Sequence, residues 1–239
     1  MQPQNYSTNN TFFCPNAFLI LPAMNCIVTA GPTYESLDDV RRLTNFSTGR
    51  LGTELGNFLT DQGHRVTLLI GQQATYCGGR RAHQVETFTT TANLIGQLRS
   101  HAGVKIDAVF HAAAVSDFTF GKVFERVASG DLTEITSGKF STRHGTLLTE
   151  LIPTPKIISE LRSWFPTALL AGWKFEVDGD RASVLAKARD QLTENRTDAC
   201  VANGRAYGAG FGIVTPTAPL RHCADTQELF AALEQMLRK

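Results

Sequence analysis

Short apolar runs alternate with longer amphipathic segments along most of the chain. The apolar runs have the length of buried strands, and the longer segments repeat their apolar residues at helical spacing. This alternation predicts a mainly parallel sheet with helices packed against it. We expect strands over residues 25–29, 65–70, 107–111, 168–173, 198–202 and 211–214, and helices over residues 49–62, 91–102, 155–164, 180–194 and 226–237.

Residues at the ends of several elements support these boundaries. Gly63 follows the first helix as a typical C-terminal stop, and Asp225 precedes the last helix as an N-cap. Ser47 or Thr48 is expected to cap the start of the first helix. The predicted fold class is therefore α/β, with one doubly wound, Rossmann-like domain that carries helices on both faces of the sheet. Folds of this class bind ligands at the carboxyl ends of their strands.

One region has no clear period. The glycines and mixed charges of residues 118–146 predict loops and a short hairpin over the ligand site, followed by an extended segment over residues 146–151.

Composition narrows the classes of partner. With 239 residues, 42% of them hydrophobic, we expect a single domain over residues 24–239 and an N-terminal extension of unknown order over residues 1–23. A net charge of +1 predicts no nucleic-acid partner. The apolar residues 18–22 are too short to span a bilayer, and residues 1–17 lack the basic residues of a signal peptide, so we expect no membrane association.

The cysteines favour a reducing compartment. Five of them are scattered without CxxC spacing, at Cys14, Cys26, Cys77, Cys200 and Cys223. This pattern predicts neither a zinc site nor a disulfide framework, so we assign no metal ligands and expect a cytoplasmic location. Cys26 and Cys200 lie in apolar runs and are expected in the core.

The first chemical signal is the segment of residues 45–52 (NFSTGRLG), which opens the first helix. Gly49 and Gly52 leave backbone amides accessible where a ligand would meet the helix start. Such a start is a natural phosphate site, although the same residues also suit a capped helix with glycines for close packing. The chain has no Walker phosphate loop and no GxGxxG fingerprint.

Four separated segments together resemble the phosphopantothenate–cysteine ligase family. They are residues 28–33 (VTAGPT), 40–52 (VRRLTNFSTGRLG), 112–118 (AAAVSDF) and 201–203 (VAN), in the order of the family, with residues 172–176 (GWKFE) in support. The resemblance covers about residues 24–238 and implies a stand-alone form without flavin.

That resemblance implies a reaction in two steps. The carboxylate of 4'-phosphopantothenate attacks the α-phosphorus of CTP or ATP, which releases pyrophosphate and leaves an acyl-nucleotide. The amine of L-cysteine then attacks the activated carbonyl and displaces the nucleoside monophosphate. Mg²⁺ is expected on the phosphates, and a homodimer is the family's assembly.

Site residues follow from the same resemblance. The nucleotide positions are Gly31, Ser47, Gly49, Gly52, Trp173, Lys174 and Asn203. Trp173 stands where the family usually has phenylalanine, so recognition of the base is open there. The WKFE run resembles forms that use ATP, which is a hint about the nucleotide.

The substrate positions are Arg41, Asn45, Ala113, Ala114 and Asp117. Asn45 matches the asparagine that holds the carboxylate or acyl intermediate. Small side chains at the two alanines are expected to let backbone amides approach the phosphate, and Arg41 is expected to reach it across a dimer interface, with Arg42 as a rival.

Lys139 matches the first lysine of a mobile basic motif that closes over the triphosphate. Phe140, Ser141 and Thr142 follow it, so only one charge of that motif is present. Asn45 and Lys139 are therefore the predicted catalytic pair.

Two other functions stay open at this point. The sequence after residue 110 faintly resembles short-chain dehydrogenases, which would make the chain an NAD(P)-dependent oxidoreductase. No tyrosine lies four residues before a lysine, however, which argues against that chemistry. A non-catalytic protein that binds nucleotide or phosphopantothenate on the same scaffold is the other alternative.

Overall fold

A computed structural model describes residues 22–141, 143 and 145–238. Its centre is an eight-stranded sheet with the order β13-β12-β11-β10-β6-β1-β4-β5. These strands are β1 (Asn25–Ala30), β4 (Arg65–Gly71), β5 (Gln84–Phe88), β6 (Ala108–His111), β10 (Leu169–Phe175), β11 (Ala199–Asn203), β12 (Phe211–Val214) and β13 (Arg221–Cys223). The strands from β5 to β11 are parallel, whereas β12 and β13 are antiparallel.

Helices cover both faces of this sheet. Helices α1 (Arg50–Asp61) and α5 (Thr226–Leu237) pack on one face, where their apolar residues join those of the central strands. On the other face lie α2 (Thr91–Ser100), α3 (Ile157–Trp164) and α4 (Arg181–Asn195). The prediction of a doubly wound sheet is confirmed. The strand order reverses between β1 and β6, and ligands bind at such a switch point in open α/β sheets.

Several local predictions are also confirmed. Gly63 has φ 86° after α1, and the Asp225 carboxylate accepts from the amide of Glu228 at 2.9 Å as the N-cap of α5. Cys26 and Cys200 are buried, and burial raises the pKa of both thiols to about 12. These two cysteines therefore act as core residues and stay protonated at neutral pH.

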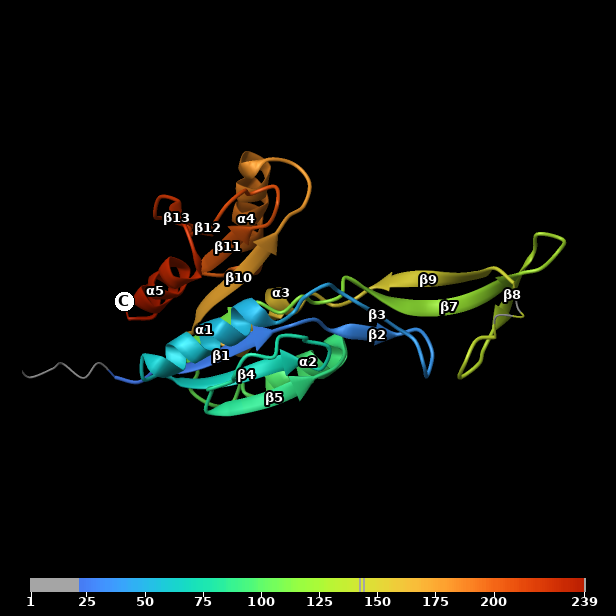
Figure 1. The fold of residues 1–239 in the computed structure, drawn as a ribbon, viewed down its shortest axis with the longest axis horizontal. Coiled ribbons are helices and arrows are strands. Elements are labelled where there is room, and N and C mark those ends of the chain that lie inside the picture. Colours follow the sequence, from blue (N-terminus) through green and yellow to red (C-terminus); the bar gives the residue numbers. More distant parts are fainter. Residues whose placement is uncertain (1–21, 142, 144, 239) are drawn as a thin grey trace, which may run out of the picture.

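The irregular region was predicted with the wrong placement. This part of the chain contains a three-stranded antiparallel sheet of β7 (Phe118–Arg126), β8 (Leu132–Ile135) and β9 (Leu147–Pro153). We call this sheet the arm, because it projects away from the central sheet instead of folding back over it (Figure 1). A second small sheet, β2 (Tyr34–Ser36) with β3 (Arg42–Thr44), lies between the arm and the core.

The boundary predictions at the N-terminus are tested only in part. Most of the predicted extension, residues 1–21 with Cys14, lies outside the described residues. In the described part of the chain, no helix is both long enough and apolar enough to cross a bilayer.

Candidate active site

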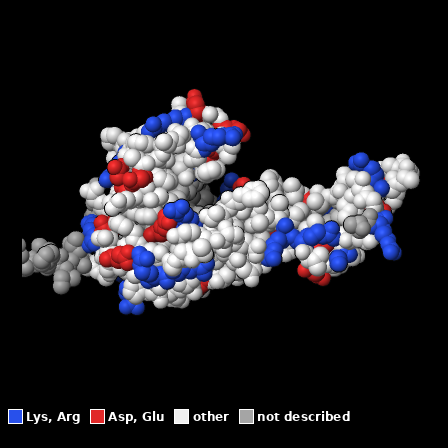
Figure 2. Space-filling view, in the orientation of Figure 1, with Lys and Arg blue, Asp and Glu red and all other residues white. Residues whose placement is uncertain are grey.

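A cavity of about 720 Å³ opens at the carboxyl ends of the parallel strands, where the strand order reverses. Figure 2 shows the hollow between the two halves of the central domain. Its lining combines the loops after β1 and β6, the start of α1, the start of α3 and the last residues of β10 and β11. The volume suits a ligand of nucleotide or cofactor size.

The start of α1 forms one wall of the cavity. Gly49 is the N-cap residue and has a left-handed backbone with φ 78°, so neither Ser47 nor Thr48 caps the helix as expected. The Thr48 hydroxyl accepts a hydrogen bond from the amide of Arg50 at 3.3 Å, which occupies one amide of the first turn. The amides of the first turn have no partner within the helix. This start has no side-chain bond from its N-cap Gly49, so the amides of Leu51 and Gly52 remain as N–H donors beside the cavity, together with the positive end of the helix dipole.

Close packing explains the two glycines of this turn. A Cβ added to Gly52 would lie 2.6 Å from the Cβ of Ala30, and one added to Gly49 would lie 2.9 Å from the Cβ of Ala74. The helix start is therefore pressed directly against β1 and the loop after β4. These distances support the packing role of the two glycines, and their role in ligand binding stays a prediction.

The loops after β1 and β6 are joined into one unit at the base of the cavity. The amide of Ala114 donates to the carbonyl of Gly31 at 2.9 Å, and the amide of Thr33 donates back to the carbonyl of Ala114 at 3.1 Å. The amide of Ala113 donates to the Thr29 hydroxyl at 3.1 Å. The backbone amides of both alanines thus have partners inside the protein, which differs from the expectation that they approach a phosphate.

Asn45 is held on this same unit. Its Nδ2 donates to the carbonyl oxygens of Ala114 and Val115, both at 3.2 Å. Both partners are acceptors, so the orientation of the amide is fixed and its Oδ1 remains for a ligand. Toward the cavity, the Asn45 side chain therefore offers an acceptor and not a donor.

Three cations and one carboxylate line the cavity: Arg50, Lys156, Lys174 and Asp117. Arg50 and Lys174 each have an acidic neighbour, because Nε of Arg50 lies 2.7 Å from Glu54 and Nζ of Lys174 lies 3.3 Å from Glu176. Hydrogen bonds, first from Lys187 and then from Lys174, lower the pKa of Glu176 despite its partial burial. The excess of positive charge suits a polyanionic ligand.

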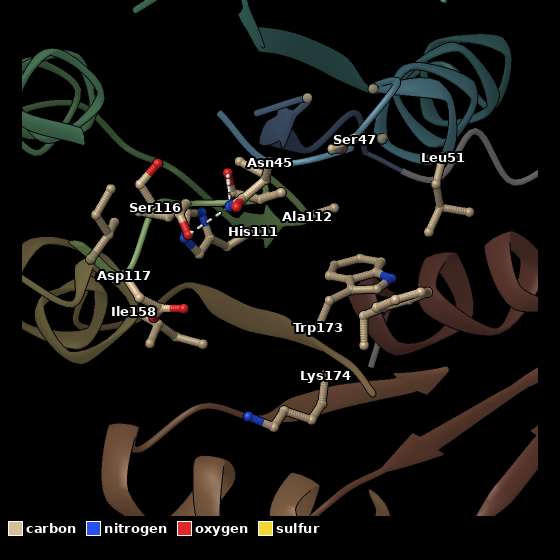
Figure 3. Close-up of a pocket in the computed structure, with 18 of the residues that line it drawn as sticks. Asn45, Ser47, Leu51, His111, Ala112, Ser116, Asp117, Ile158, Trp173 and Lys174 are labelled. Atoms are coloured by element: carbon tan, nitrogen blue, oxygen red, sulfur yellow. Dashed lines mark hydrogen bonds between the residues drawn. The ribbon is translucent and has the colours of Figure 1, made fainter. Parts of the chain in front are cut away.

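His111, at the end of β6, is a buried group of the cavity lining with 7% of its surface exposed. Its Nδ1 lies 2.9 Å from the hydroxyl of Thr29. Burial lowers the pKa of the imidazole to about 4, so His111 is neutral at physiological pH. Figure 3 shows His111 with Asn45 and Ser116 at one end of the cavity and Trp173 at the other.

Trp173 and Asn203 line the end of the cavity toward α1 and β11. The indole Nε1 of Trp173 and the Oδ1 of Asn203 are enclosed and have no hydrogen-bond partner in the described structure. Trp173 packs against the core on the α1 side of the sheet, whereas Lys174 faces the opposite side.

The cavity brings together all the predicted site residues except two. Gly31, Asn45, Ser47, Gly49, Gly52, Ala113, Ala114, Asp117, Trp173, Lys174 and Asn203 all line it. Arg41 and Lys139 do not. They lie near each other beside the arm, where Arg41 donates to the carbonyl of Phe140 at 2.6 Å and forms an ion pair with Asp38 at 2.7 Å.

Sequence reasoning missed Arg50, His111, Lys156 and Gln191 as lining residues. The sequence could have indicated two of these, since Arg50 lies inside the glycine-rich segment and His111 directly precedes the alanine run. Lys156 and Gln191 come from helices whose approach to the cavity depends on tertiary packing.

Comparison with known proteins gives a consistent result. Residues 21–234 match the family model of the DNA/pantothenate metabolism flavoprotein C-terminal domain. The chain is 32% identical over 191 residues to the coenzyme A biosynthesis bifunctional protein CoaBC of Thermococcus kodakarensis, a match that covers 79% of this chain and 43% of that protein. The chain thus spans less than half the length of the curated relatives it matches.

Solved structures agree with this match. The DNA/pantothenate metabolism flavoprotein of Streptococcus pneumoniae has a TM-score of 0.77 at 26% identity, over 90% of this chain and 99% of that chain. A Cab2 variant in complex with phosphopantothenate-cysteine shares the fold, with a TM-score of 0.67 at 18% identity over 90% of this chain and 87% of that chain. The chain therefore belongs to the family of the DNA/pantothenate metabolism flavoprotein C-terminal domain.

Proposed function

We propose that this chain is a nucleotide-dependent ligase that joins 4'-phosphopantothenate to L-cysteine through an acyl-nucleotide, as a step of coenzyme A biosynthesis in the cytoplasm. One observation carries the proposal. The uncapped start of α1, the amide of Asn45 and the cation of Lys174 all line a single cavity at the switch point of the sheet. A site for this reaction must hold a polyphosphate and a carboxylate together, and this lining offers groups for both.

The nucleotide occupies the α1 end of the cavity. First-turn amides beside Gly49 and the guanidinium of Arg50 bind its phosphates, and Trp173 and Asn203 contact its base or sugar. Lys174 supplies a further positive charge. CTP and ATP are both candidates, and the WKFE run of residues 172–176 favours ATP.

Asp117 and the nucleotide phosphates would hold the expected Mg²⁺. Among the described residues, no three potential ligands of the His, Cys, Asp or Glu type come together, and Asp117 is the carboxylate of the cavity lining. One carboxylate plus substrate phosphates is a usual Mg²⁺ environment, in which the ion neutralises phosphate charge. No flavin has a role in this scheme.

The acid to be activated lies at the Asn45 end. Asp117, Ala113 and Ala114 form its wall, and the Oδ1 of Asn45 accepts a hydrogen bond from the cysteine amine as that amine approaches the acyl carbon. This acceptor role fits the orientation of the Asn45 amide, whose nitrogen is occupied by the Ala114 and Val115 carbonyls.

Arg41 acts from a second copy of the chain. It does not line the cavity of its own chain, and it lies beside an arm that exposes Phe118, Leu132, Leu151 and Ile152. Apolar side chains on a projecting sheet are suited to pairing with a second copy. Lys139, in the same neighbourhood, closes over the triphosphate when its loop moves.

The activity is tested by mixing the purified protein with 4'-phosphopantothenate, L-cysteine, Mg²⁺ and either CTP or ATP. Over many turnovers, each further pyrophosphate requires that cysteine first clear the acyl-nucleotide, so the steady rate of release should lie well above that of an Asn45→Ala variant with at least one nucleotide. Equal release by the two proteins with both nucleotides would overturn the proposal. Binding of phosphopantothenate without turnover would favour a non-catalytic protein, and tight binding of NADPH would favour an oxidoreductase.

The role of Arg41 in a dimer is tested by mixing two inactive variants, Arg41→Ala and Asn45→Ala. Random pairing gives mixed dimers in which one cavity has both intact residues, so about a quarter of the wild-type sites should return. A mixture that stays inactive after subunit exchange would place Arg41 in the cavity of its own chain.

A further inference from the structure

The Thr29 hydroxyl fixes the tautomer of His111. Thr29 is fully buried, and its Oγ1 accepts the amide of Ala113 at 3.1 Å. A buried hydroxyl also needs an acceptor for its own proton. The Nδ1 of His111, at 2.9 Å, is the partner in the described structure that can accept it. Nδ1 is therefore unprotonated, and the proton of the neutral imidazole resides on Nε2.

The Nε2 atom is directed to the cavity. His111 is more than nine-tenths buried and belongs to the lining, yet its Nε2 has no hydrogen bond within the described residues. Nor does Nε2 belong to the fully enclosed polar atoms without a partner found in that part of the chain. It therefore has access to the cavity, at the end that also holds Asn45 (Figure 3).

The second step of the proposed reaction requires a donor at this end. When the cysteine amine attacks the acyl carbon, the carbonyl π electrons move to oxygen. The tetrahedral intermediate then expels the nucleoside monophosphate, and the amine proton leaves to solvent. Asn45 cannot stabilise that oxygen, because both Nδ2 protons face the carbonyls of Ala114 and Val115. The backbone amides of Ala113 and Ala114 are not available either, because they donate to the Thr29 hydroxyl and the Gly31 carbonyl.

We propose that His111 is the catalytic donor of this step, with its Nε2–H hydrogen-bonded to the acyl oxygen. The inference rests on the proposed ligase function. A neutral donor stabilises the oxyanion and leaves no fixed positive charge beside the amine nitrogen, which becomes positive as it attacks. Thr29 is the positioning residue, since its hydroxyl selects the tautomer.

The two half-reactions respond differently to loss of this donor. In the first step the carboxylate loses negative charge, whereas in the second step the carbonyl oxygen gains it, so only the second step needs the hydrogen bond. His111→Phe should release pyrophosphate from phosphopantothenate and nucleotide at nearly the wild-type rate. Transfer of the acyl group to cysteine should be about 100-fold slower, as for the loss of one oxyanion donor.

His111→Gln is the matched variant, because its side-chain amide places an N–H near the position of Nε2. It should transfer the acyl group within about tenfold of the wild-type rate. If both steps are unchanged in His111→Phe, or both slow equally, the inference is overturned. If the wild-type protein releases no pyrophosphate at all, the ligase function itself fails, and the spectroscopic test below still decides the tautomer.

Nitrogen-15 NMR of the wild-type protein tests the assignment without turnover. At neutral pH the ring of His111 should have its proton on Nε2, and the signal of that nitrogen should shift when phosphopantothenate is added. Thr29→Val, which removes the hydroxyl, should redistribute the proton between the two nitrogens. A proton on Nδ1 in the wild-type protein, or no response of Nε2 to phosphopantothenate, would overturn the proposal.

Discussion

The switch-point edge of the central sheet and the projecting arm are built in different ways. At the edge, the loops after β1 and β6 are joined by backbone bonds of 2.9–3.2 Å, and Gly52 has no room for a Cβ. The arm exposes Leu132 and Leu151, and the segment between β8 and β9 is held to the loop before β3 by hydrogen bonds such as that from Arg41 to the carbonyl of Phe140. The edge is therefore a fixed framework, which suits its proposed role in holding reactants, whereas the arm has the exposed surface that the proposed dimer would use.

We expect the largest loss of stability and activity from a substitution at Gly52, where the edge has no space for a side chain. Gly52→Ala places a Cβ 2.6 Å from the Cβ of Ala30. The helix start must shift, which should destabilise the fold by about 1–3 kcal/mol and lower kcat/KM about 100-fold. Thermal unfolding and pyrophosphate release measure the two effects.

Gly56→Ala is the control in the same helix, one turn later. Its added Cβ meets Val66 at an ordinary 3.7 Å, so the free energy of unfolding should rise by roughly 0.5–1 kcal/mol and activity should stay intact. Similar behaviour of the two variants would contradict the idea that the helix start is a fixed wall of the site.

The arm should govern assembly. Leu151→Lys places a charge on its exposed apolar surface, where 51% of Leu151 is accessible, and should shift the protein from dimer to monomer in sedimentation experiments. Activity should fall by about tenfold or more, because a monomer cannot place Arg41 in the cavity of a second chain.

Val104→Lys changes a residue of similar exposure, 59%, on the central domain. It should leave the sedimentation profile unchanged. If both substitutions dissociate the dimer, or if neither does, the exposed surface of the arm is not the dimer interface.

Lys139→Gln should lower kcat about tenfold, since one charge on the leaving pyrophosphate is lost. Lys122→Gln is the matched control on the arm, where Lys122 pairs with Glu134 at 2.7 Å, and it should keep full activity. Steady-state kinetics at saturating nucleotide distinguish the two. Equal losses would indicate a general effect of charge on the arm.

The smallest effect concerns the loop that links Arg41 to the arm. Desolvation raises the pKa of Asp38, but hydrogen bonds from the Phe140 and Val40 amides and from Arg41 outweigh it and lower the pKa to about 2. These contacts are therefore complete above the ordinary carboxylate pKa near 4, and they weaken as pH falls toward 2. Amide exchange at Phe140 should accelerate a few-fold over that window, beyond the change at an unlinked amide of the central sheet.

The contrast between edge and arm also explains what the sequence could predict. Strands such as β1 and β4 and helices such as α1 are continuous apolar or amphipathic runs, so the pattern found them within one or two residues. The short strands β2, β3, β5 and β13 were missed. Each has only three to five residues with few buried positions, so none forms an apolar run, and each is ordered by pairing with a neighbouring strand.

The candidate site divides in the same way. Residues in compact motifs, such as Asn45 and Gly49, were placed in the cavity that the structure describes. The orientation of Asn45 could not be predicted, because it is set by carbonyls about 70 residues later in the chain. The direction of the arm, and with it the position of Lys139, depends on packing that periodicity does not encode.

The bonds between the loops after β1 and β6 also set an order of events during synthesis. Thr29 and His111 lie 82 residues apart in the chain, so the base of the cavity cannot form until β6 has left the ribosome and inserted beside β1. Non-local pairing of this kind is a slow part of folding. A nascent chain that ends before β6 contains all the residues of α1 and yet lacks one side of the cavity.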